Sequence, residues 1–317
     1  MSVLLSRHAD AIYWLARYIE RTENMARILD VNETFSRNAL GEQNWAAVLH
    51  IYSDTERFAA THPAPTTDAV IQFYTLARDN ETSIVSQLKA VRENARMLRP
   101  LISTEMWIQI NTFYNRVAGK RRADVMEARL SAFCAMVKEG CQTHTGITEG
   151  TFLRDEAWLI YEAGRAIERA DQTTRLLDVK YHLLLPSVDD VGSRLDVSQW
   201  NALLRSAAAY HAFRRVHPRG LSPALVAAFL LFDRHFARSV RACMVRLTGL
   251  LDEMDRVYGI SPAKEARAEL AAVLATLEAE SIDEVIGRGL HEFLDRIQTE
   301  LIRVSDAVRH SFVPDGA

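Results

Sequence analysis

The sequence predicts an all-α protein, a bundle of about ten helices built from an internal duplication with an approximate two-fold axis. Three observations support this fold class. Apolar residues recur at helical spacings of three, four and seven, and no alternating strand pattern competes with them. Only 13 Gly and 8 Pro interrupt the 317 residues, with no proline between Pro100 and Pro186. Finally, one long segment occurs twice, in diverged form.

The first long helix is expected over Arg7–Asn38, where one apolar face is traced by Ile12, Leu15, Ile19, Ala26 and Leu29. A second long helix is expected over Thr151–Leu185. The polar residues Pro186–Asp196, rich in turn formers, predict the longest linker, which does not separate domains. Turn residues and renewed periodicity predict that further helices follow Gly41, Thr66, Pro100, Lys120, Asp196, Leu221, Pro262 and Ser281.

The repeated segment reads IYWLARYIERTENMARILDV at Ile12–Val31 and IYEAGRAIERADQTTRLLDV at Ile160–Val179. Downstream, Trp45 is echoed by Trp200, and further echoes follow in the same order: Phe73 and Phe229, Arg78 and Arg234, Ser83 and Ser239, and Ile84 and Val240. We therefore predict two helical halves, residues 1–150 and 151–317, forming one compact unit. The final helices of each half show no match in sequence.

The repeat preserves charged residues. About 100 degrees of rotation per residue places Tyr13, Arg17, Glu20, Asn24 and Arg27 on one stripe of a helix, apart from its apolar face. A solvated face has no physical reason to keep these charges in both copies, so we predict contacts between the halves in a mostly buried network. The balance of charge favours a structural network, and a ligand site remains the alternative. The candidate residues are Arg17, Glu20, Arg21, Arg27, Arg165, Glu168, Arg169 and Arg175.

Composition excludes several classes of protein. The net charge of -3 lacks the basic excess of nucleic-acid-binding proteins. The longest apolar run, Ala224–Phe232, is far shorter than the roughly 18 residues of a membrane span, and no signal peptide is evident. Three cysteines are too few for a disulfide framework. We expect a cytoplasmic protein without nucleic acid or membrane partners.

The sequence lacks known catalytic patterns. No histidine has a glutamate three residues before it, as a di-iron bundle requires, and no phosphate loop, dinucleotide fingerprint or nucleophile elbow occurs. Cys141 and His144 lack a companion pair for zinc, so we expect a core cysteine and a surface histidine. No metal or cofactor is predicted. Structural roles are expected for Ser83 and Ser239 as helix caps, Trp45 and Trp200 as core anchors, and Cys134, Cys141 and Cys243 as inert thiols.

Several motifs carry a family resemblance. They are Arg17-Tyr-Ile-Glu-Arg21, Gly164-Arg-Ala-Ile-Glu-Arg169, Arg78-Asp-Asn80, Arg92-Glu-Asn-Ala-Arg96, Ile102-Ser-Thr-Glu-Met-Trp107, Thr151-Phe-Leu-Arg-Asp155 and Leu203-Leu-Arg-Ser206. Together they resemble the Alpha-E family, named after its ER motif, over nearly the whole chain. Glu81 and Ala237 depart from the family pattern, which has proline there. The helix starts should survive, because proline at the first helical position is favourable but dispensable.

The resemblance implies a functional context. Such proteins are encoded beside, or fused to, circularly permuted ATP-grasp ligases and transglutaminase-like peptidases. The first hypothesis is therefore a non-catalytic subunit of an ATP-grasp amide or peptide ligase. The second is an enzyme acting on a peptide or amino-acid amide, with Glu20 or Glu168 as the general base. The third is an interaction module, which either presents a carboxylate-bearing peptide through its arginines or is purely structural.

Overall fold

The computed structural model describes residues 4–38, 45–184, 194–260 and 264–313. These residues form fifteen α-helices and two short 3-10 helices, and none of them forms a strand. The α-helices are α1 (Ser6–Asn38), α2 (Ala46–Ile51), α3 (Thr55–Ala59), α4 (Thr67–Thr75), α5 (Ile84–Met97), α6 (Thr104–Ala118), α7 (Leu130–Thr151), α8 (Glu156–Leu184), α9 (Arg194–Ser206), α10 (Tyr210–Val216), α11 (Pro223–Phe232), α12 (Val240–Tyr258), α13 (Lys264–Ala279), α14 (Ile282–Arg288) and α15 (Leu290–His310). The 3-10 helices are η1 (Arg122–Asp124) and η2 (Glu127–Arg129).

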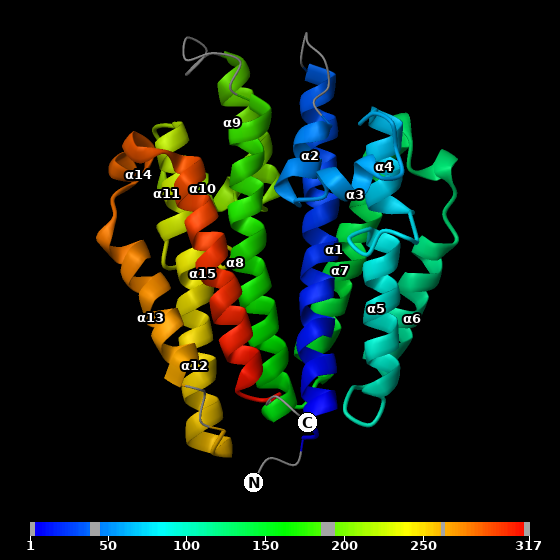
Figure 1. Cartoon of the computed structure of the whole chain (residues 1–317), viewed down its shortest axis with the longest axis vertical. Helices are drawn as coiled ribbons and strands as arrows, with labels where there is room; N and C mark the ends of the chain where they lie inside the picture. The colour runs from blue at the N-terminus through cyan, green and yellow to red at the C-terminus, as the bar shows by residue number, and fades with distance from the viewer. Residues whose placement is uncertain (1–3, 39–44, 185–193, 261–263, 314–317) are drawn as a thin grey trace.

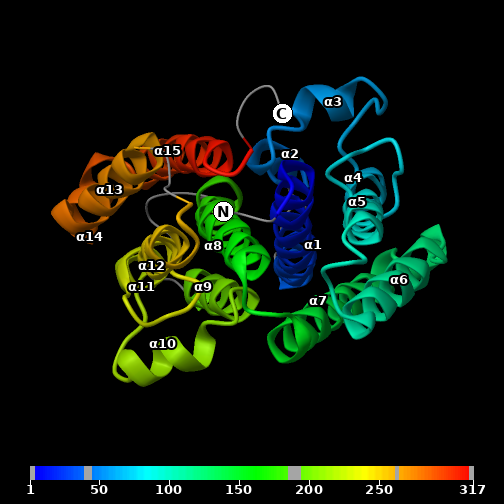
Figure 2. The ribbon, with the colours of Figure 1, turned by 90° about the horizontal axis from the view of Figure 1, so that it is seen from below.

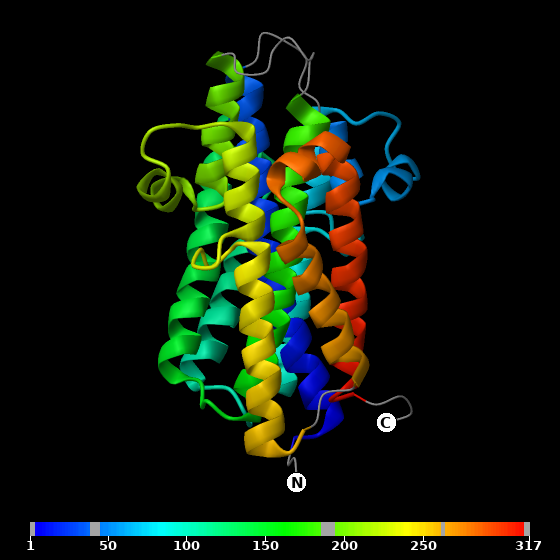
Figure 3. The ribbon, with the colours of Figure 1, turned by 90° about the vertical axis from the view of Figure 1, so that its left-hand side faces the viewer.

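The two long helices α1 and α8 lie side by side at the centre of the bundle and run in the same direction (Figures 1 and 2). Helices α5 and α7 pack on α1, and α12 and α15 pack on α8. Outer helices α6 and α13 cover these pairs. Each half also reaches across the centre, because α2 contacts α8 and α9 contacts α1. The molecule is elongated, and α1 begins at the end where α15 stops (Figure 3).

The prediction of an all-helical bundle is confirmed. The first long helix matches its expected bounds closely, but the second begins at Glu156, because Thr151 ends α7. Ten helices were too few, since one- or two-turn helices such as α3, α10 and α14 carry too little periodicity to be seen in sequence. Most of the predicted linker, residues 186–193, lies outside the described residues, and α9 already begins at Arg194.

Local backbone geometry repeats between the halves. Ser53 and Ala208 each lie eight residues after a paired tryptophan, and both have φ of 55°, the left-handed region that residues other than glycine rarely adopt. The next amide donates to an equivalent carbonyl in both places, Asp54 to Leu49 at 2.8 Å and Ala209 to Leu204 at 2.7 Å. Two unrelated segments would not share so unusual a turn.

Aromatic packing repeats as well. Phe58 stacks on His62 with ring centroids 4.4 Å apart and meets the edge of Phe73 at 5.2 Å. The other half holds the same three ring types in the same relation, with Phe213 4.9 Å from His217 and 5.6 Å from Phe229. These pairs are what the predicted duplication requires. The two-fold itself stays a prediction until the halves are superposed, as does the division near Gly150.

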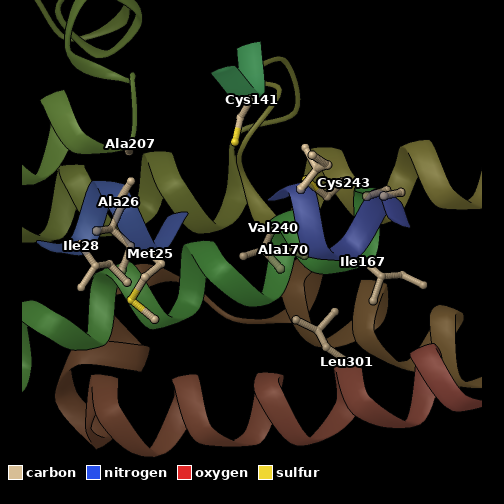
Figure 4. Close-up of a cluster of buried hydrophobic side chains, with 14 of the residues drawn as sticks. Met25, Ala26, Ile28, Cys141, Ile167, Ala170, Ala207, Val240, Cys243 and Leu301 are labelled. Carbon is tan, nitrogen blue, oxygen red and sulfur yellow. The ribbon is translucent and has the colours of Figure 1, made fainter. Parts of the chain in front are cut away.

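The core is continuous through both halves. Figure 4 shows one part of it, where Met25 and Ile28 of α1, Ile167 of α8 and Leu301 of α15 gather. Trp45 and Trp200 are buried, as predicted for core anchors. The three cysteines are free and buried, and burial raises the pKa of the Cys243 thiol to about 12. Such a thiol is protonated at neutral pH, as expected for an inert cysteine.

His144 does not lie on the surface as predicted. It is fully buried on α7, on the same face as Cys141, and the Thr148 hydroxyl lies 3.3 Å from its Nε2. Burial, with a smaller effect of Arg165, lowers the pKa of His144 to about 4. The sequence misled because a lone histidine looks polar, whereas a neutral imidazole packs readily in a helical core.

Among the described residues, none of the helices combines the length and the apolar character needed to cross a bilayer.

Candidate functional site

The centre of the molecule is the contact between α1 and α8. Gly164 allows these helices to approach closely, because a Cβ at this position would lie 2.7 Å from the carbonyl oxygen of Tyr13. At this contact the repeated charges face each other across the two halves. Each helix contributes one fully enclosed glutamate, Glu20 or Glu168, to a network of arginines.

Glu168 is held by both arginines of the first ER helix. Arg17 donates from Nε to Oε2 at 2.7 Å, and Arg21 donates from Nε to Oε1. Gln172 adds a third donor, from Nε2 to Oε1 at 3.0 Å. Burial raises the pKa of Glu168, but the charges of Arg21 and Arg17 outweigh it and hold that pKa at about 2. The carboxylate therefore stays ionised at every physiological pH.

Glu20 is held from the opposite half. Arg169 binds it through two bonds, from Nε to Oε1 at 3.0 Å and from Nη2 to Oε2 at 2.8 Å. Arg238, from the turn before α12, bridges two carboxylates, with Nη1 2.7 Å from Glu20 Oε1 and Nη2 2.9 Å from Glu23 Oε1. Burial opposes ionisation of Glu20, but Arg169 and Arg238 together hold its pKa well below the ordinary value.

Arg27 and Arg175 join the halves in a way that the sequence did not predict. Each forms an ion pair on its own helix, Arg27 with Glu23 and Arg175 with Asp171. The other end of each guanidinium donates to a backbone carbonyl of the opposite half. Arg27 Nη1 binds the Ser206 oxygen at 2.5 Å, and Arg175 Nη1 binds the Ile51 oxygen at 2.6 Å. We expected these two residues to meet the charged side chains of the partner helix, but each binds the carbonyl of the last residue of a helix from the opposite half, α9 for Arg27 and α2 for Arg175.

Arg165 is the candidate that stays outside the cross-helix network. It pairs with Glu162 on its own helix, from Nη2 to Oε2 at 2.7 Å. In the first copy of the repeat, Trp14 stands where Glu162 stands in the second. The equivalent Arg17 lies over the Trp14 ring, 4.9 Å from its centroid, and is free to reach Glu168. Local carboxylate competition thus explains the difference.

Arg238 is the functional residue that repeat matching missed, because its counterpart one residue before the repeated serine is Thr82. Each carboxylate pair nevertheless has three arginines. Glu20 and Glu23 have Arg169, Arg27 and Arg238, while Glu168 and Asp171 have Arg21, Arg175 and Arg17. Arg17 therefore supplies to Glu168 and Asp171 the positive charge that Arg238 supplies to Glu20 and Glu23. Because Thr82 is smaller than arginine, it leaves space beside Glu168 and Asp171.

A cavity of about 590 Å³ occupies this open face. We call it the open pocket. Its walls come from both halves and include Tyr18, Arg21, Tyr52, Arg57, Asp171 and Arg175. The equivalent cavity beside Arg169 measures about 290 Å³, and there Ala242 and Cys243 replace the polar Ser86 and Gln87. The two faces therefore differ, with a large polar pocket on one and a small hollow on the other.

Arg21 has hydrogen-bonding capacity left for a ligand. Its Nε is used by Glu168, whereas its terminal nitrogens Nη1 and Nη2 have no hydrogen-bond partner among the described residues. Its side chain is 32% exposed, against 17% for the doubly bonded Arg169. The planar end of Arg21 can therefore donate two parallel bonds into the open pocket.

Two more guanidiniums line the open pocket. Arg175 lies 5.9 Å from the centroid of the Tyr52 ring, and Arg57 lies 3.3 Å from Asp54 with half of its side chain exposed. The Tyr52 hydroxyl donates to Gln172 Oε1 at 3.2 Å, and burial raises the pKa of this phenol. The pocket lining thus holds three arginines, each with a carboxylate partner nearby, together with the carboxylates of Asp171 and Glu81.

One group of metal-type ligands comes together in the part of the chain that the structure describes. Asp178, His291 and Asp295 offer one atom each within 4.8 Å of one another. His291 places Nδ1 2.8 Å from Asp178 Oδ1 and Nε2 3.5 Å from Asp295 Oδ2, so both ring nitrogens already face carboxylates. This bridge between α8 and α15 accounts for the group without an ion, and the expected lack of a metal stays a prediction.

Comparison with known proteins gives the family of the chain. The model of a family described as "a predicted alpha-helical domain with a conserved ER motif" matches residues 4–313. The chain belongs to the Alpha-E family. Its two ER dipeptides, Glu20-Arg21 and Glu168-Arg169, are the residues that bind each other across α1 and α8. The ER motif of this Alpha-E protein is therefore the contact between its two halves.

Curated relatives of this Alpha-E protein are longer. An uncharacterized protein of Mycobacterium bovis is 24% identical over 324 residues, which cover 94% of this chain and 36% of the relative. Uncharacterized proteins of two Mycobacterium tuberculosis strains, CDC 1551 and H37Rv, have the same identity and coverage. The chain thus spans little more than a third of the curated relatives it matches. No solved structure matches the chain significantly.

Proposed function

We propose that this Alpha-E protein is a non-catalytic component of an ATP-grasp-type amide or peptide ligase system, and that it holds a carboxylate-bearing peptide or amino-acid-like ligand in the open pocket. The observation that carries the proposal is the unused end of Arg21, which faces a polar cavity between the halves. The other ER arginine, Arg169, uses both Nε and Nη2 to bind Glu20.

Carboxylate is the ligand chemistry that fits this site. A guanidinium fork donates two parallel bonds to a carboxylate, and each charge-assisted bond contributes roughly 1.5–3 kcal/mol. Trp14 supports Arg21 from behind, with the guanidinium carbon 5.6 Å from the ring centroid, so little side-chain freedom is lost on binding. The neighbouring charges of Arg57 and Arg175 favour an anion further.

The geometry speaks against the enzyme hypothesis. A general base works best with a pKa near the operating pH. Glu168 has a pKa of about 2 and three donors on its oxygens, and the pKa of Glu20 is also depressed. Neither carboxylate has a free basic oxygen to offer a substrate. A purely structural module would explain the network, but not the unused nitrogens of Arg21.

Partnership with a ligase is supported from two directions. The family resemblance connects such chains to circularly permuted ATP-grasp ligases and to transglutaminase-like peptidases. In the curated relatives the Alpha-E region is about a third of a longer polypeptide, so this fold works there beside other sequence. Phosphoryl chemistry would then belong to the ligase, and recognition to this chain.

Calorimetric titration with acetyl-diglycine tests the binding step. We expect binding that is lost when the probe is the C-terminal amide. Arg21→Gln should weaken binding at least tenfold, because the fork is removed while Arg17 and Gln172 still hold Glu168. The matched variant is Arg169→Gln, the same residue of the other ER motif, which should lower the melting temperature instead. Equal binding by wild type and Arg21→Gln would contradict the proposal.

Reconstitution tests the partnership. A circularly permuted ATP-grasp ligase from the same organism should co-purify with this protein and form product faster in its presence, while the Alpha-E protein alone should not hydrolyse ATP. Ligation at the full rate without the Alpha-E protein would contradict the proposal that the two proteins work together.

A further inference from the structure

A second, smaller hollow adjoins the open pocket along α1 and α8. It has a volume of about 200 Å³, and α15 forms its far wall. Half of its lining residues are apolar, namely Trp14, Ile167, Leu301 and Ile302, and the others are Arg17, Asp171, Ser305 and Asp306. Ile302 lies in this lining with 55% of its surface exposed. We call this hollow the side pocket.

Asp171 connects the side pocket with the open pocket, since it lines both. Its Oδ2 accepts from Arg175 Nε at 2.8 Å and lies 3.4 Å from the Gln172 amide. Its other oxygen, Oδ1, has no hydrogen-bond partner among the described residues. An acceptor is therefore available at the boundary between a cationic and an apolar compartment.

Across the two pockets, the structure places a carboxylate-binding fork at Arg21, an acceptor at Asp171, which lines both pockets, and apolar surface at Trp14 and Ile302 in the side pocket. A peptide end has the same order: a terminal carboxylate, a backbone N–H and the side chain of the preceding residue. An isolated amino acid or a simple dicarboxylate has no group for the side pocket, and its apolar walls would stay hydrated.

We infer that the ligand is a peptide with a free C-terminus whose penultimate residue has an aliphatic side chain, and that this side chain occupies the side pocket while Asp171 accepts a peptide N–H. This inference rests on the proposed function, because Arg21 supplies the carboxylate end. It adds a specificity that the fork cannot provide, since a guanidinium binds every carboxylate alike.

Calorimetric titration of the full chain with two probes tests the inference. Acetyl-leucyl-glycine should bind at least tenfold more tightly than acetyl-diglycine, because the leucine side chain leaves water. Ile302→Asn makes the rim polar and should reduce this affinity ratio severalfold. The matched control is Ile286→Asn, an exposed isoleucine of α14 away from the groove, which should leave the ratio as in wild type.

The outcomes separate the two proposals. Equal affinities for the two probes, with binding still dependent on Arg21 and on the free carboxylate, would show that the side pocket does not bind the penultimate side chain. The proposed function would then still stand. A leucine preference that persists with the C-terminal amide and in Arg21→Gln would keep the side pocket and overturn carboxylate recognition. Absence of binding by both probes at millimolar concentration would overturn both. A ratio that Ile302→Asn leaves unchanged would contradict the inference as well.

Discussion

Glu168 shows how single residues hold the two halves together. It is completely buried, and its oxygens accept only from charged or amide donors that surround it in the core. A buried carboxylate of this kind contributes little net stability when it is paired, but removing one partner leaves charge uncompensated in a medium of low polarity. The residue is therefore a sensitive reporter of the network.

Glu168→Gln should lower the free energy of unfolding by about 3–5 kcal/mol at pH 7, because the buried Arg17 and the partly exposed Arg21 would both lose their anion. Urea denaturation followed by circular dichroism measures this loss. Leu153→Gln, at a residue with 71% of its surface exposed, provides the control and should change stability by less than about 0.5 kcal/mol.

Stability should also respond to acid through the same carboxylate. Since the folded pKa of about 2 lies below the ordinary glutamate pKa of 4.5, the unfolded chain takes up the proton first as the pH falls. The contribution of Glu168 is complete above pH 4.5 and is lost between pH 4.5 and 2. Denaturation curves across this range should show a shallower acid limb in Glu168→Gln than in wild type. Equal slopes would mean that the carboxylate is not held as the structure shows.

The sequence predicted which residues meet at the centre, but not every pair. The repeat correctly predicted that five residues meet between the two long helices, because they are identical in both copies of the repeated segment: Arg17, Glu20, Arg21, Glu168 and Arg169. Arg238 was not predicted to belong to the network, because only residues that match between the two copies were considered. The difference between Arg238 and Thr82 nevertheless distinguishes the open pocket from the smaller hollow on the other face. Arg165 was placed in the network because its own neighbour Glu162, three residues earlier, was not weighed as a competing partner. Ligand roles for all these residues stay predictions.

Helix starts are the features of single elements that the sequence predicted best. Ser83 accepts from the Ser86 amide at 3.2 Å, and Ser239 accepts from the Ala242 amide at 3.1 Å, as expected for caps of α5 and α12. Both hydroxyls also donate to a carbonyl of the preceding turn. These bonds confirm the predicted capping role of both hydroxyls.

Replacing either cap by alanine should therefore cost about 1–2 kcal/mol of unfolding free energy, and the two losses should agree within error, because their environments are equivalent. Thermal denaturation of Ser83→Ala, Ser239→Ala and the double variant measures this. The two losses should add, since the sites lie in different halves. A much larger loss at one serine would indicate that the equivalence of the two helix starts is wrong.

Gly164 tests the close contact between α1 and α8. Alanine normally stabilises a helix interior over glycine by about 1 kcal/mol, but here a Cβ would lie 2.7 Å from a backbone oxygen. We expect Gly164→Ala to destabilise the protein by more than about 2 kcal/mol, because backbone must shift. Gly249→Ala on α12 is the control, with no atom within 4 Å of the added methyl group, and should be neutral or stabilising. Similar effects of both changes would contradict the helix contact.

Long helices were predicted well because many turns support their periodicity, as in α1. Short helices and the pairing of distant elements were not predictable. The sequence of α7 and α15 shows no repeat, yet they pack equivalently on α1 and α8. Helix packing tolerates many apolar residues of similar volume, so shape is retained while residue identity drifts.

At the scale of the whole molecule, the two halves form one core across α1 and α8. Superposing residues 10–100 on residues 158–250 in a crystal structure should align α1 with α8, α4 with α11 and α5 with α12, in the same connectivity. The turns at Ser53 and Ala208 should coincide, because both have left-handed backbone. Different helix directions in these segments would contradict the duplication.

A polar pocket of about 590 Å³ lies on the face where Thr82 stands at the position matching Arg238. The most direct test of this account is a crystal structure of the protein soaked with acetyl-diglycine. We predict that the carboxylate lies within hydrogen-bonding distance of Nη1 and Nη2 of Arg21, with Glu168 still bound to Arg17. Two results would contradict the account. One is a probe carboxylate bound at another place, and the other is an open pocket without bound probe at a saturating probe concentration.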